Sequence, residues 1–261
     1  MSAGSNGFQQ AFNKVARYRG AVELGWYDFI TVFRRSFFGA LWPAFQLAAW
    51  VGTLTLLFSG RLGGSIGEYA LYVGIGAYAW DFISWSLGEG PGHITSQGQL
   101  LKNVPSNLST ITVRKIAYLV FRSAFQLPVP LFVLFMYADP VGPEVLLLAP
   151  VIPLYLLSAF SMLTIMGIIG VYFRDFQFLM PSITRILFFT TPIFWRGDSG
   201  FRKILSDYNP FSYYLELVRA PLSGEFASLE AWGVVGFLSV SGFFLAIFLQ
   251  SKFRHEVVYR I

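Results

Sequence analysis

Six long apolar segments dominate the chain. They cover residues 41–59, 69–87, 111–137, 145–173, 176–195 and 231–250. Each approaches or exceeds the roughly 20 residues that an α-helix needs to cross the hydrocarbon core of a bilayer. Because backbone in lipid has to satisfy its own hydrogen bonds, apolar runs of this length favour helices. We therefore predict an all-α, polytopic membrane protein with six transmembrane helices in a single domain, 1–261.

Lysine and arginine are distributed unequally between the two sides that six spans define. An even number of spans puts both termini on one side, and the side of the termini collects most of the basic residues. The other side holds Arg61, Arg196, Arg202, Lys203 and Arg219. Since basic residues accumulate in cytoplasmic loops, both termini are predicted to be cytoplasmic. The net charge of +5 then reflects membrane topology and not binding to nucleic acid.

Residues 1–40 carry apolar side chains at helical spacing, opposite basic and polar ones. One stripe consists of Phe8, Phe12, Val15 and Val22, and a second of Trp26, Phe29, Ile30, Phe33 and Phe37. The second stripe ends beside Arg34 and Arg35. This pattern predicts amphipathic helices in the cytoplasmic interface, with the apolar face in the acyl boundary and the basic residues at anionic headgroups of membrane lipids. A soluble helix packed against a partner is the alternative.

Residues 196–228 are too charged to cross a bilayer and too aromatic for a simple loop. Two short amphipathic stripes lie on either side of Asn209-Pro210, and Pro221 and Gly224 end the second. They predict two short helices that form a hairpin re-entering the outer, periplasmic leaflet. A helix pair lying on the surface is the alternative. We expect Tyr213 and Tyr214 to hold this hairpin together.

Composition excludes several classes of chemistry. The chain is 55% hydrophobic and 13% charged, which is typical of a polytopic membrane protein. The absence of cysteine excludes disulfides, iron–sulfur clusters and cysteine-based zinc sites, and the two histidines make no credible metal site. None of the five lysines follows a glycine, so the chain lacks the Gly-x-x-x-x-Gly-Lys-Ser/Thr loop and cannot hydrolyse ATP by that route. Gly74 and Gly76 lack a strand–turn–helix context and indicate close helix packing.

The loop between the second and third spans carries a possible docking segment. Gly90-Pro91-Gly92 breaks the preceding helix, and Ser96 is expected to cap a short helix that Pro105 ends. Two consecutive leucines, Leu100 and Leu101, indicate that this helix binds in an apolar groove of a partner protein. A helix resting on the protein's own spans is the alternative.

Charged and aromatic residues inside the spans are candidates for a substrate path. Asp81 and Arg185 would each cost about 2.5–3.5 kcal/mol at mid-bilayer, so both should face protein or water. They form a buried structural pair or, alternatively, belong to a proton relay. Aromatic faces can stack on sugar rings, although most such residues in membrane proteins pack or form interfacial belts. The path candidates are Trp42, Tyr72, Tyr78, Trp80, Asp81 and Arg185.

Together these features resemble one family. The most specific stretches are Arg-Asp-Phe at 174–176, Phe-Phe-Thr-Thr-Pro-Ile-Phe-Trp at 188–195, and the sequence from Tyr208 to Gly224. They are similar to the membrane subunit of ABC-type polysaccharide and polyol-phosphate exporters, particularly O-antigen export permeases. The resemblance implies a non-enzymatic subunit in a bacterial inner membrane. The family moves a lipid-linked polysaccharide from the cytoplasm to the periplasm.

The resemblance also implies partners and roles. It implies a homodimer bound to two copies of a separate ATP-binding subunit, which holds the ATP and Mg that this chain does not. The ATPase-coupling residues would be Ser96, Gln97, Gln99, Leu100, Leu101 and Lys102; Arg34 and Arg35 would meet the substrate's pyrophosphate or the ATPase. The exit hairpin would include Tyr208, Asn209, Pro210, Tyr213, Tyr214 and Arg219.

Four alternative functions stay open on sequence alone. Within transport they are export of another glycan, such as capsule or teichoic acid, and export of a small lipid or drug. From other classes they are an integral-membrane glycosyltransferase and a proton-coupled carrier. The last two would need clustered acids or titratable groups along a route, and within the spans the sequence offers Asp81 alone as an acid.

Overall fold

The computed structural model describes residues 3–61, 65–98, 107–138, 142–197 and 199–260, and every regular element within them is a helix. The long helices are α1 (Ala3–Phe33), α2 (Trp42–Phe58), α3 (Ile66–Gly88), α6 (Leu108–Gln126), α7 (Pro128–Tyr137), α8 (Leu148–Tyr172), α9 (Phe176–Thr190), α10 (Gly200–Tyr208), α11 (Pro210–Leu222) and α12 (Leu229–Arg260). Short helical turns are η1 (Gly39–Leu41), η2 (Ser59–Arg61), α4 (Gly90–His93), η3 (Thr95–Gln97) and η4 (Pro143–Leu147). The all-α prediction is confirmed for these residues.

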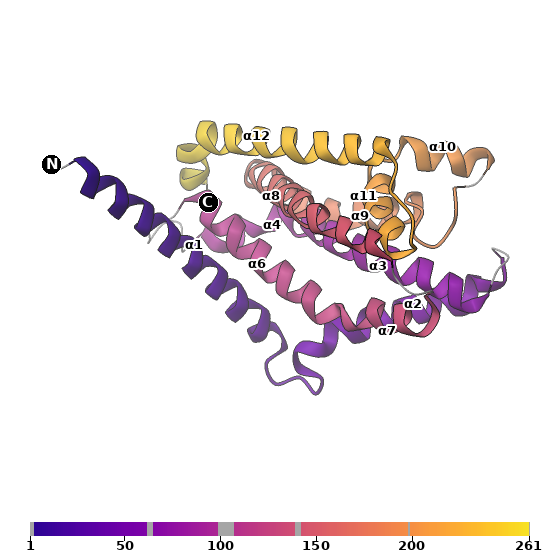
Figure 1. Ribbon diagram of the computed structural model, residues 1–261. Coiled ribbons are helices and arrows are strands. Elements are labelled where there is room, and N and C mark those ends of the chain that lie inside the picture. The colour runs from indigo at the N-terminus through magenta and orange to yellow at the C-terminus, as the bar shows by residue number, and fades with distance from the viewer. Residues whose placement is uncertain (1–2, 62–64, 99–106, 139–141, 198, 261) are drawn as a thin grey trace.

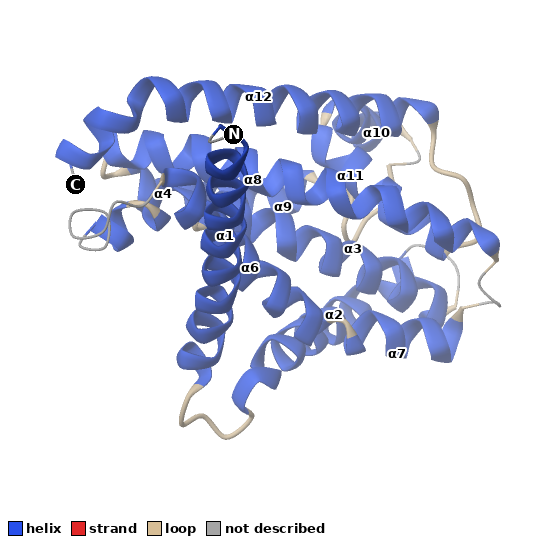
Figure 2. Ribbon diagram, turned by 60° about the vertical axis from the view of Figure 1, so that its left-hand side comes forward, coloured by secondary structure: helices blue, strands red, loops and turns tan. Residues whose placement is uncertain are grey.

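The helices form a bundle with α3 at its centre. α3 contacts α2, α6, α7, α8, α9 and α11, while α12 packs along α8 at one edge. Figure 1 shows α1 leaning outward at the other edge, along α6. Figure 2 shows α10 and α11 near one end of α12, with the C-terminus at its other end. The bundle therefore has a hairpin end, where α10 and α11 lie, and a loop end, where α4 lies.

Four helical stretches of the described chain are long and apolar enough to cross a membrane. They are Gly39–Phe58, Leu108–Tyr137, Pro143–Tyr172 and Leu229–Arg254. Two predicted spans are not among them. α9 has only 15 residues, and α3 contains glycines, tyrosines, tryptophans and Asp81, all of which lower its hydropathy. The protein is thus a multi-pass membrane protein, while the number of six spans stays a prediction.

The N-terminal region differs from the prediction of separate interface helices. Residues 3–33 form one continuous helix, α1. Part of its second stripe packs on α6: Phe29 is fully buried, and Trp26 contacts Phe121 with ring centroids 4.9 Å apart, because α6 offers aromatic rings to this face. Ile30 and Phe37 of the same stripe are exposed, and their place in the membrane interface stays a prediction. Arg34 and Arg35 follow the helix and are exposed, and Arg35 has a positive φ of 71°.

The fifth predicted span, 176–195, is helical only as far as Thr190. Pro192 disfavours the helical conformation of the residue before it. Thr191 accordingly has φ −93° and ψ 138°, and residues 191–195 form an irregular turn. The prediction of a helix to Trp195 was therefore wrong over its last five residues.

Two helices separated at Asn209-Pro210 follow, as the sequence pattern predicts. α10 ends at Tyr208 and α11 begins at Pro210, with the Asn209 side chain accepting a hydrogen bond from Phe211 N at 3.0 Å. Pro210 fits the first helical position, where its missing N–H costs nothing. Whether this hairpin re-enters the membrane stays a prediction.

Candidate functional site

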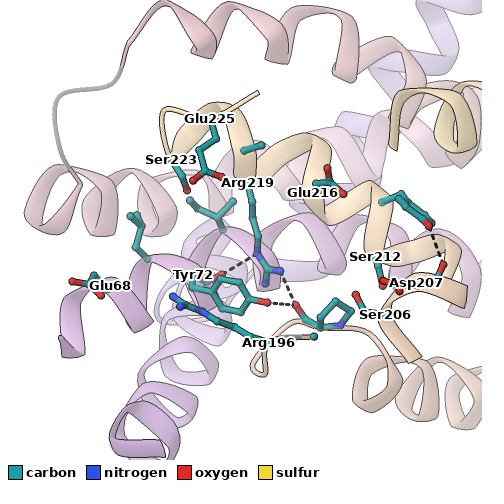
Figure 3. A pocket seen from close by; sticks show the side chains of 16 residues that line it. Glu68, Tyr72, Arg196, Ser206, Asp207, Ser212, Glu216, Arg219, Ser223 and Glu225 are labelled. Atoms are coloured by element: carbon teal, nitrogen blue, oxygen red, sulfur yellow. Dashed lines mark hydrogen bonds between the residues drawn. The ribbon is translucent and has the colours of Figure 1, made fainter. Parts of the chain in front are cut away.

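Arg219 of α11 binds α3 and the turn after α9. Its Nη1 donates to Pro192 O at 2.6 Å, its Nη2 to Ile193 O at 2.9 Å and its Nε to Tyr72 O at 3.2 Å. The guanidinium also lies 3.7 Å from the centroid of the Tyr72 ring (Figure 3). Burial lowers the pKa of Arg219 from its usual value, but an arginine stays charged in proteins. One side chain thus joins three parts of the bundle.

All four backbone carbonyls from Pro192 to Trp195 accept side-chain hydrogen bonds. Besides the two from Arg219, Tyr72 Oη lies 2.9 Å from both Pro192 O and Trp195 O, and Tyr69 Oη donates to Phe194 O at 2.7 Å. An irregular backbone buried in a protein or a membrane needs such partners. α3 and α11 therefore make the non-helical turn possible.

Gly76 leaves the space that Arg219 occupies. A Cβ built at this glycine would overlap the guanidinium, whereas one at Gly74 would make ordinary contacts of 3.8 Å with Val51 and Val133. The predicted close packing is therefore found at Gly76, against the Arg219 side chain, and not at Gly74.

The tyrosines and Asn209 hold the hairpin in place. Tyr214 is buried; its Oη lies 2.7 Å from Ser158 Oγ, and its carbonyl accepts from Tyr155 Oη at 2.7 Å. Tyr213 Oη lies 2.9 Å from Asp207 O and 2.8 Å from a Glu230 carboxylate oxygen. Burial and this carboxylate raise the pKa of Tyr213 to about 12.

Asn209 connects the break between α10 and α11 to the end of α9. Its Nδ2 donates to Thr190 O at 3.1 Å and to Thr191 Oγ1 at 2.9 Å. The hairpin is therefore fixed both at its break and along α11.

α3 borders three cavities at successive levels. The first, the hairpin cavity, has a volume of about 490 Å³ and is bordered by Glu68, Tyr72, Arg196, Asp207, Glu216 and Arg219, among others (Figure 3). Acidic and basic side chains share its walls. It suits polar, uncharged groups or water better than a single ion.

The second, the mid-helix cavity, lies halfway along α3 and measures about 360 Å³. Its polar wall is an ion pair in which Arg122 Nη2 lies 3.1 Å from the Asp81 carboxylate. The Arg122 guanidinium also stacks over Trp85, 4.2 Å from the ring. Both charges belong to helices that run through the apolar bundle, and each neutralises the other there.

The third, the loop cavity, lies at the other end of α3 and measures about 470 Å³. Arg114 of α6 makes a two-point ion pair with Asp28 of α1, with both N–O distances 2.6 Å. Gln97 accepts a further hydrogen bond from Arg114 at 3.2 Å. These contacts join α1, α6 and η3 beside the docking segment predicted from the sequence.

His93 is buried at the edge of the loop cavity. Its Nδ1 lies 2.7 Å from Gly90 O and its Nε2 lies 3.4 Å from Thr112 Oγ1. Burial lowers its pKa to about 4, with a smaller contribution from the positive charge of Lys115. The ring is therefore neutral at physiological pH. Gly167 on α8 accommodates it, since a Cβ there would overlap the ring.

Comparison with known proteins places this bundle in a family. Residues 21–222 match the family described as ABC-2 type transporter. The chain belongs to the ABC-2 transporter family. It is also similar to the O-antigen export system permease protein RfbA of Myxococcus xanthus, with 24% identity over 199 residues that cover 74% of this chain and 76% of the relative. The chain is therefore the membrane subunit of an ABC-2 type transporter, a class that works with an ATPase.

The structure of this ABC-2 transporter subunit brings some of the predicted path residues together and separates others. Tyr72 borders the hairpin cavity, and Trp80 and Asp81 border the mid-helix cavity. Tyr78 instead accepts a hydrogen bond from Ser123 at 2.9 Å, and Trp42 is more than a third exposed on α2. These last two border none of the three cavities.

The predicted pairing of Asp81 with Arg185 is wrong. Asp81 pairs with Arg122, while Arg185 is exposed on the surface of α9. The reason is register: Arg122 of α6 lies beside Asp81 on α3, and Arg185 points away from the bundle. The Arg185 side chain therefore lies on the outer surface of the subunit.

The predicted coupling segment is only partly described. Ser96 lies in η3, and its Oγ donates to His93 O at 3.0 Å. The helix that Ser96 is expected to cap runs into residues 99–106, outside the described part of the chain, so this cap stays a prediction. Gln97 borders the loop cavity, whereas Gln99, Leu100, Leu101 and Lys102 lie outside the described residues.

Sequence reasoning missed three polar groups of this site. They are the Asp28–Arg114 pair, Arg122 as the partner of Asp81, and His93 as a buried neutral ring. Arg122 had a usable signal, because a basic residue inside an apolar run requires a partner at the same depth. The other two depend on how α1 and α4 pack, which no periodicity specifies.

Proposed function

We propose that this chain is the channel-forming subunit of an ATP-driven exporter that moves a lipid-linked polysaccharide, O-antigen in the first instance, across the inner membrane to the periplasm. The likeness to an O-antigen export permease over about three quarters of both chains carries this proposal. Family membership from residue 21 to residue 222 includes the irregular turn and the hairpin. Polar cavities at three levels of α3 suit a hydroxyl-rich polymer better than a purely apolar cargo.

The proposed assembly is a homodimer with two copies of an ATP-binding subunit that supplies ATP and Mg. In the proposed orientation the loop end of the bundle is cytoplasmic and the hairpin end is periplasmic. Arg114, Lys115 and Lys252 lie toward the loop end and support this orientation by the excess of basic residues on the cytoplasmic side. The segment 96–104 would then transmit the motion of the ATPase to α3 and α6.

Deleting the gene tests the proposed cargo. Loss of surface O-antigen, with undecorated lipid A outside and polymer accumulating in the cytoplasm, is the expected result. Complementation with the intact chain should restore the surface glycan. A normal surface glycan in the deletion strain would reject O-antigen export, and loss of a capsule or teichoic acid would redirect the proposal to that polymer.

Replacing Leu100 and Leu101 together by Asp tests the coupling role. We expect export and stimulation of the ATPase to fall while the protein still inserts, because a charged segment no longer fits an apolar groove. Leu229→Asp is the matched control, since Leu229 is 90% exposed at the hairpin end of α12. Unchanged ATPase stimulation in the double variant would reject the coupling assignment.

A further inference from the structure

The hairpin cavity lies at the depth where the membrane-crossing helices begin and end. Glu68, which borders it, follows Gly67, and the ring of Tyr137, the last residue of a membrane-crossing stretch, lies against that glycine. Glu225, on another wall, comes just before Leu229, where a further such stretch begins. Phospholipid headgroups lie immediately outside the hydrocarbon core, at the ends of the spans. The cavity is therefore at headgroup level.

The walls of this cavity carry charges of both signs that do not pair with each other. The Arg196 guanidinium lies 5.3 Å from the centroid of the Tyr72 ring and forms no ion pair with any carboxylate of the described residues. Glu68 and Glu225 likewise form no ion pair within the described part of the chain. Arg219, the second arginine at the cavity, already donates to three backbone carbonyls. One cation and two anions therefore remain available to a ligand.

A buried hydroxyl at the same cavity also lacks a partner. Ser212 of α11 is 9% exposed, and its Oγ makes no hydrogen bond to the described residues. It borders the hairpin cavity, as Arg196 and Glu68 do (Figure 3). Because buried polar groups almost always have a hydrogen-bond partner, this hydroxyl indicates that a polar group of a ligand belongs in the cavity.

Exposed apolar side chains flank the charged walls. Ile66 precedes Glu68 by one helical turn or less, and Phe226 follows Glu225 directly; both are exposed, as is Leu229 at the start of α12. The volume of about 490 Å³ lies within the roughly 300–1,000 Å³ typical of small-molecule sites. A ligand with a polar head in the cavity and apolar chains along this flank would cover both kinds of surface.

The pattern of charge selects among phospholipid headgroups. A phosphate accepts charge-assisted hydrogen bonds from a guanidinium such as that of Arg196, and a primary ammonium donates them to carboxylates such as those of Glu68 and Glu225. Phosphatidylglycerol has a phosphate but no cation, so these two acids would repel it. The quaternary ammonium of phosphatidylcholine has no N–H to donate. Phosphatidylethanolamine carries both of the groups that these walls require.

We propose that the hairpin cavity binds the phosphoethanolamine headgroup of a membrane phospholipid, with the phosphate on Arg196 and the ammonium on Glu68 and Glu225. Ser212 donates its hydroxyl hydrogen to a further oxygen of the same lipid. Such a lipid connects the start of α3 to the segment between α11 and α12 and so stabilises the hairpin end of the bundle. The inference goes beyond the proposed function and does not depend on which cargo the transporter moves.

Native mass spectrometry of the purified full complex tests the proposal. The probes are phosphatidylethanolamine, phosphatidylcholine and phosphatidylglycerol with identical acyl chains, added at equal concentrations. We expect phosphatidylethanolamine to be retained in preference to the other two. Arg196→Gln should weaken its binding about ten-fold, as loss of one charge-assisted hydrogen bond predicts, and Glu68→Gln should reduce the preference over phosphatidylcholine. Arg202→Gln, which changes an exposed arginine of α10 that does not border the cavity, should leave binding unchanged.

Two controls separate lipid binding from folding and from binding of a soluble phosphate ester. Since Arg196 forms no ion pair within the described residues, the melting temperature of Arg196→Gln without added lipid should match that of the parent. Soluble phosphoethanolamine should bind far more weakly than the lipid, because it has no acyl chains to cover the apolar flank. Equal binding of the soluble compound would overturn the assignment to a lipid. Equal retention of the three lipids, or equal effects of Arg196→Gln and Arg202→Gln, would overturn the headgroup site.

Discussion

The guanidinium of Arg219 lies 3.7 Å from the centre of the Tyr72 ring and donates to the Tyr72 carbonyl. This contact joins residues 147 positions apart in the sequence. The same guanidinium bonds two carbonyls of the turn after α9, and Tyr72 Oη reaches that turn too. α3, α11 and the turn are therefore joined by shared hydrogen bonds, so that displacing any one of the three breaks contacts of the other two.

Arg219→Ala should destabilise the purified protein by about 3 kcal/mol or more, because it leaves buried carbonyls without their charged donor. Arg219→Lys should recover only part of the loss, since an ammonium lacks the planar fork that reaches Tyr72, Pro192 and Ile193 together. Thermal unfolding in detergent measures both effects. Arg202→Ala, at an exposed position on α10, is the control and should change little. Equal melting temperatures for the Arg219 and Arg202 variants would contradict the role described for Arg219.

Gly76→Ala should reproduce much of the Arg219 phenotype, because its Cβ overlaps the guanidinium and forces it from its place. Gly74→Ala should be tolerated, since its Cβ meets only ordinary contacts of 3.8 Å and alanine favours helix. A melting temperature lowered in the first variant and kept or raised in the second is the expected result. If both variants behave alike, Gly76 does not make room for Arg219.

The buried His93 should make stability depend on pH. Its folded pKa of about 4 lies below the ordinary 6.5, so the unfolded chain binds a proton more readily between these values. The stabilisation is complete above the unfolded pKa and is lost as the pH falls toward the folded pKa. Lowering the pH from about 7.5 to about 5 should therefore reduce the free energy of unfolding by about 2 kcal/mol through His93 alone. His93→Gln, which cannot be protonated, should flatten that part of the melting profile; an unchanged slope would assign the pH dependence to other groups.

The ion pair of the mid-helix cavity should show strong coupling. Arg122→Met leaves the Asp81 carboxylate uncompensated among apolar helices and should cost about 3–5 kcal/mol. Replacing both partners, with Asp81→Leu added, should recover most of this loss because no buried charge remains. A double-mutant cycle by thermal unfolding gives the coupling. Additive losses would show that the two side chains do not act as a pair.

The helices and their breaks follow from the sequence where local chemistry dictates them. The break at Asn209-Pro210 follows from an asparagine that can cap a helix and a proline that fits the first helical position. The all-α fold class follows from the long apolar runs. The break and the helices rest on residues close together in the chain. Tyr213 and Tyr214 hold the hairpin as expected, but the partner of the Tyr214 hydroxyl, Ser158, lies 56 positions away and could not be named from the sequence.

Pairings between distant residues did not follow from the pattern. Asp81 pairs with Arg122 and not with Arg185 because of helix register, and Trp26 and Phe29 of α1 pack on aromatic rings of α6. The helix after Arg174 ended five residues early because Pro192 acts on the residue before it. Hydropathy averages over such single residues, and so it placed the end of this span too late.

The early end of α9 has a consequence for the bilayer itself. A helix of 15 residues rises about 22 Å, against about 30 Å for the hydrocarbon core. In the proposed orientation, the missing length lies on the periplasmic side, where the polar turn and the hairpin replace it. If α9 is the fifth span, the apolar barrier beside it is thinner than in the surrounding lipid. A hydrophilic polymer exported along this helix would then have a correspondingly shorter apolar distance to cross.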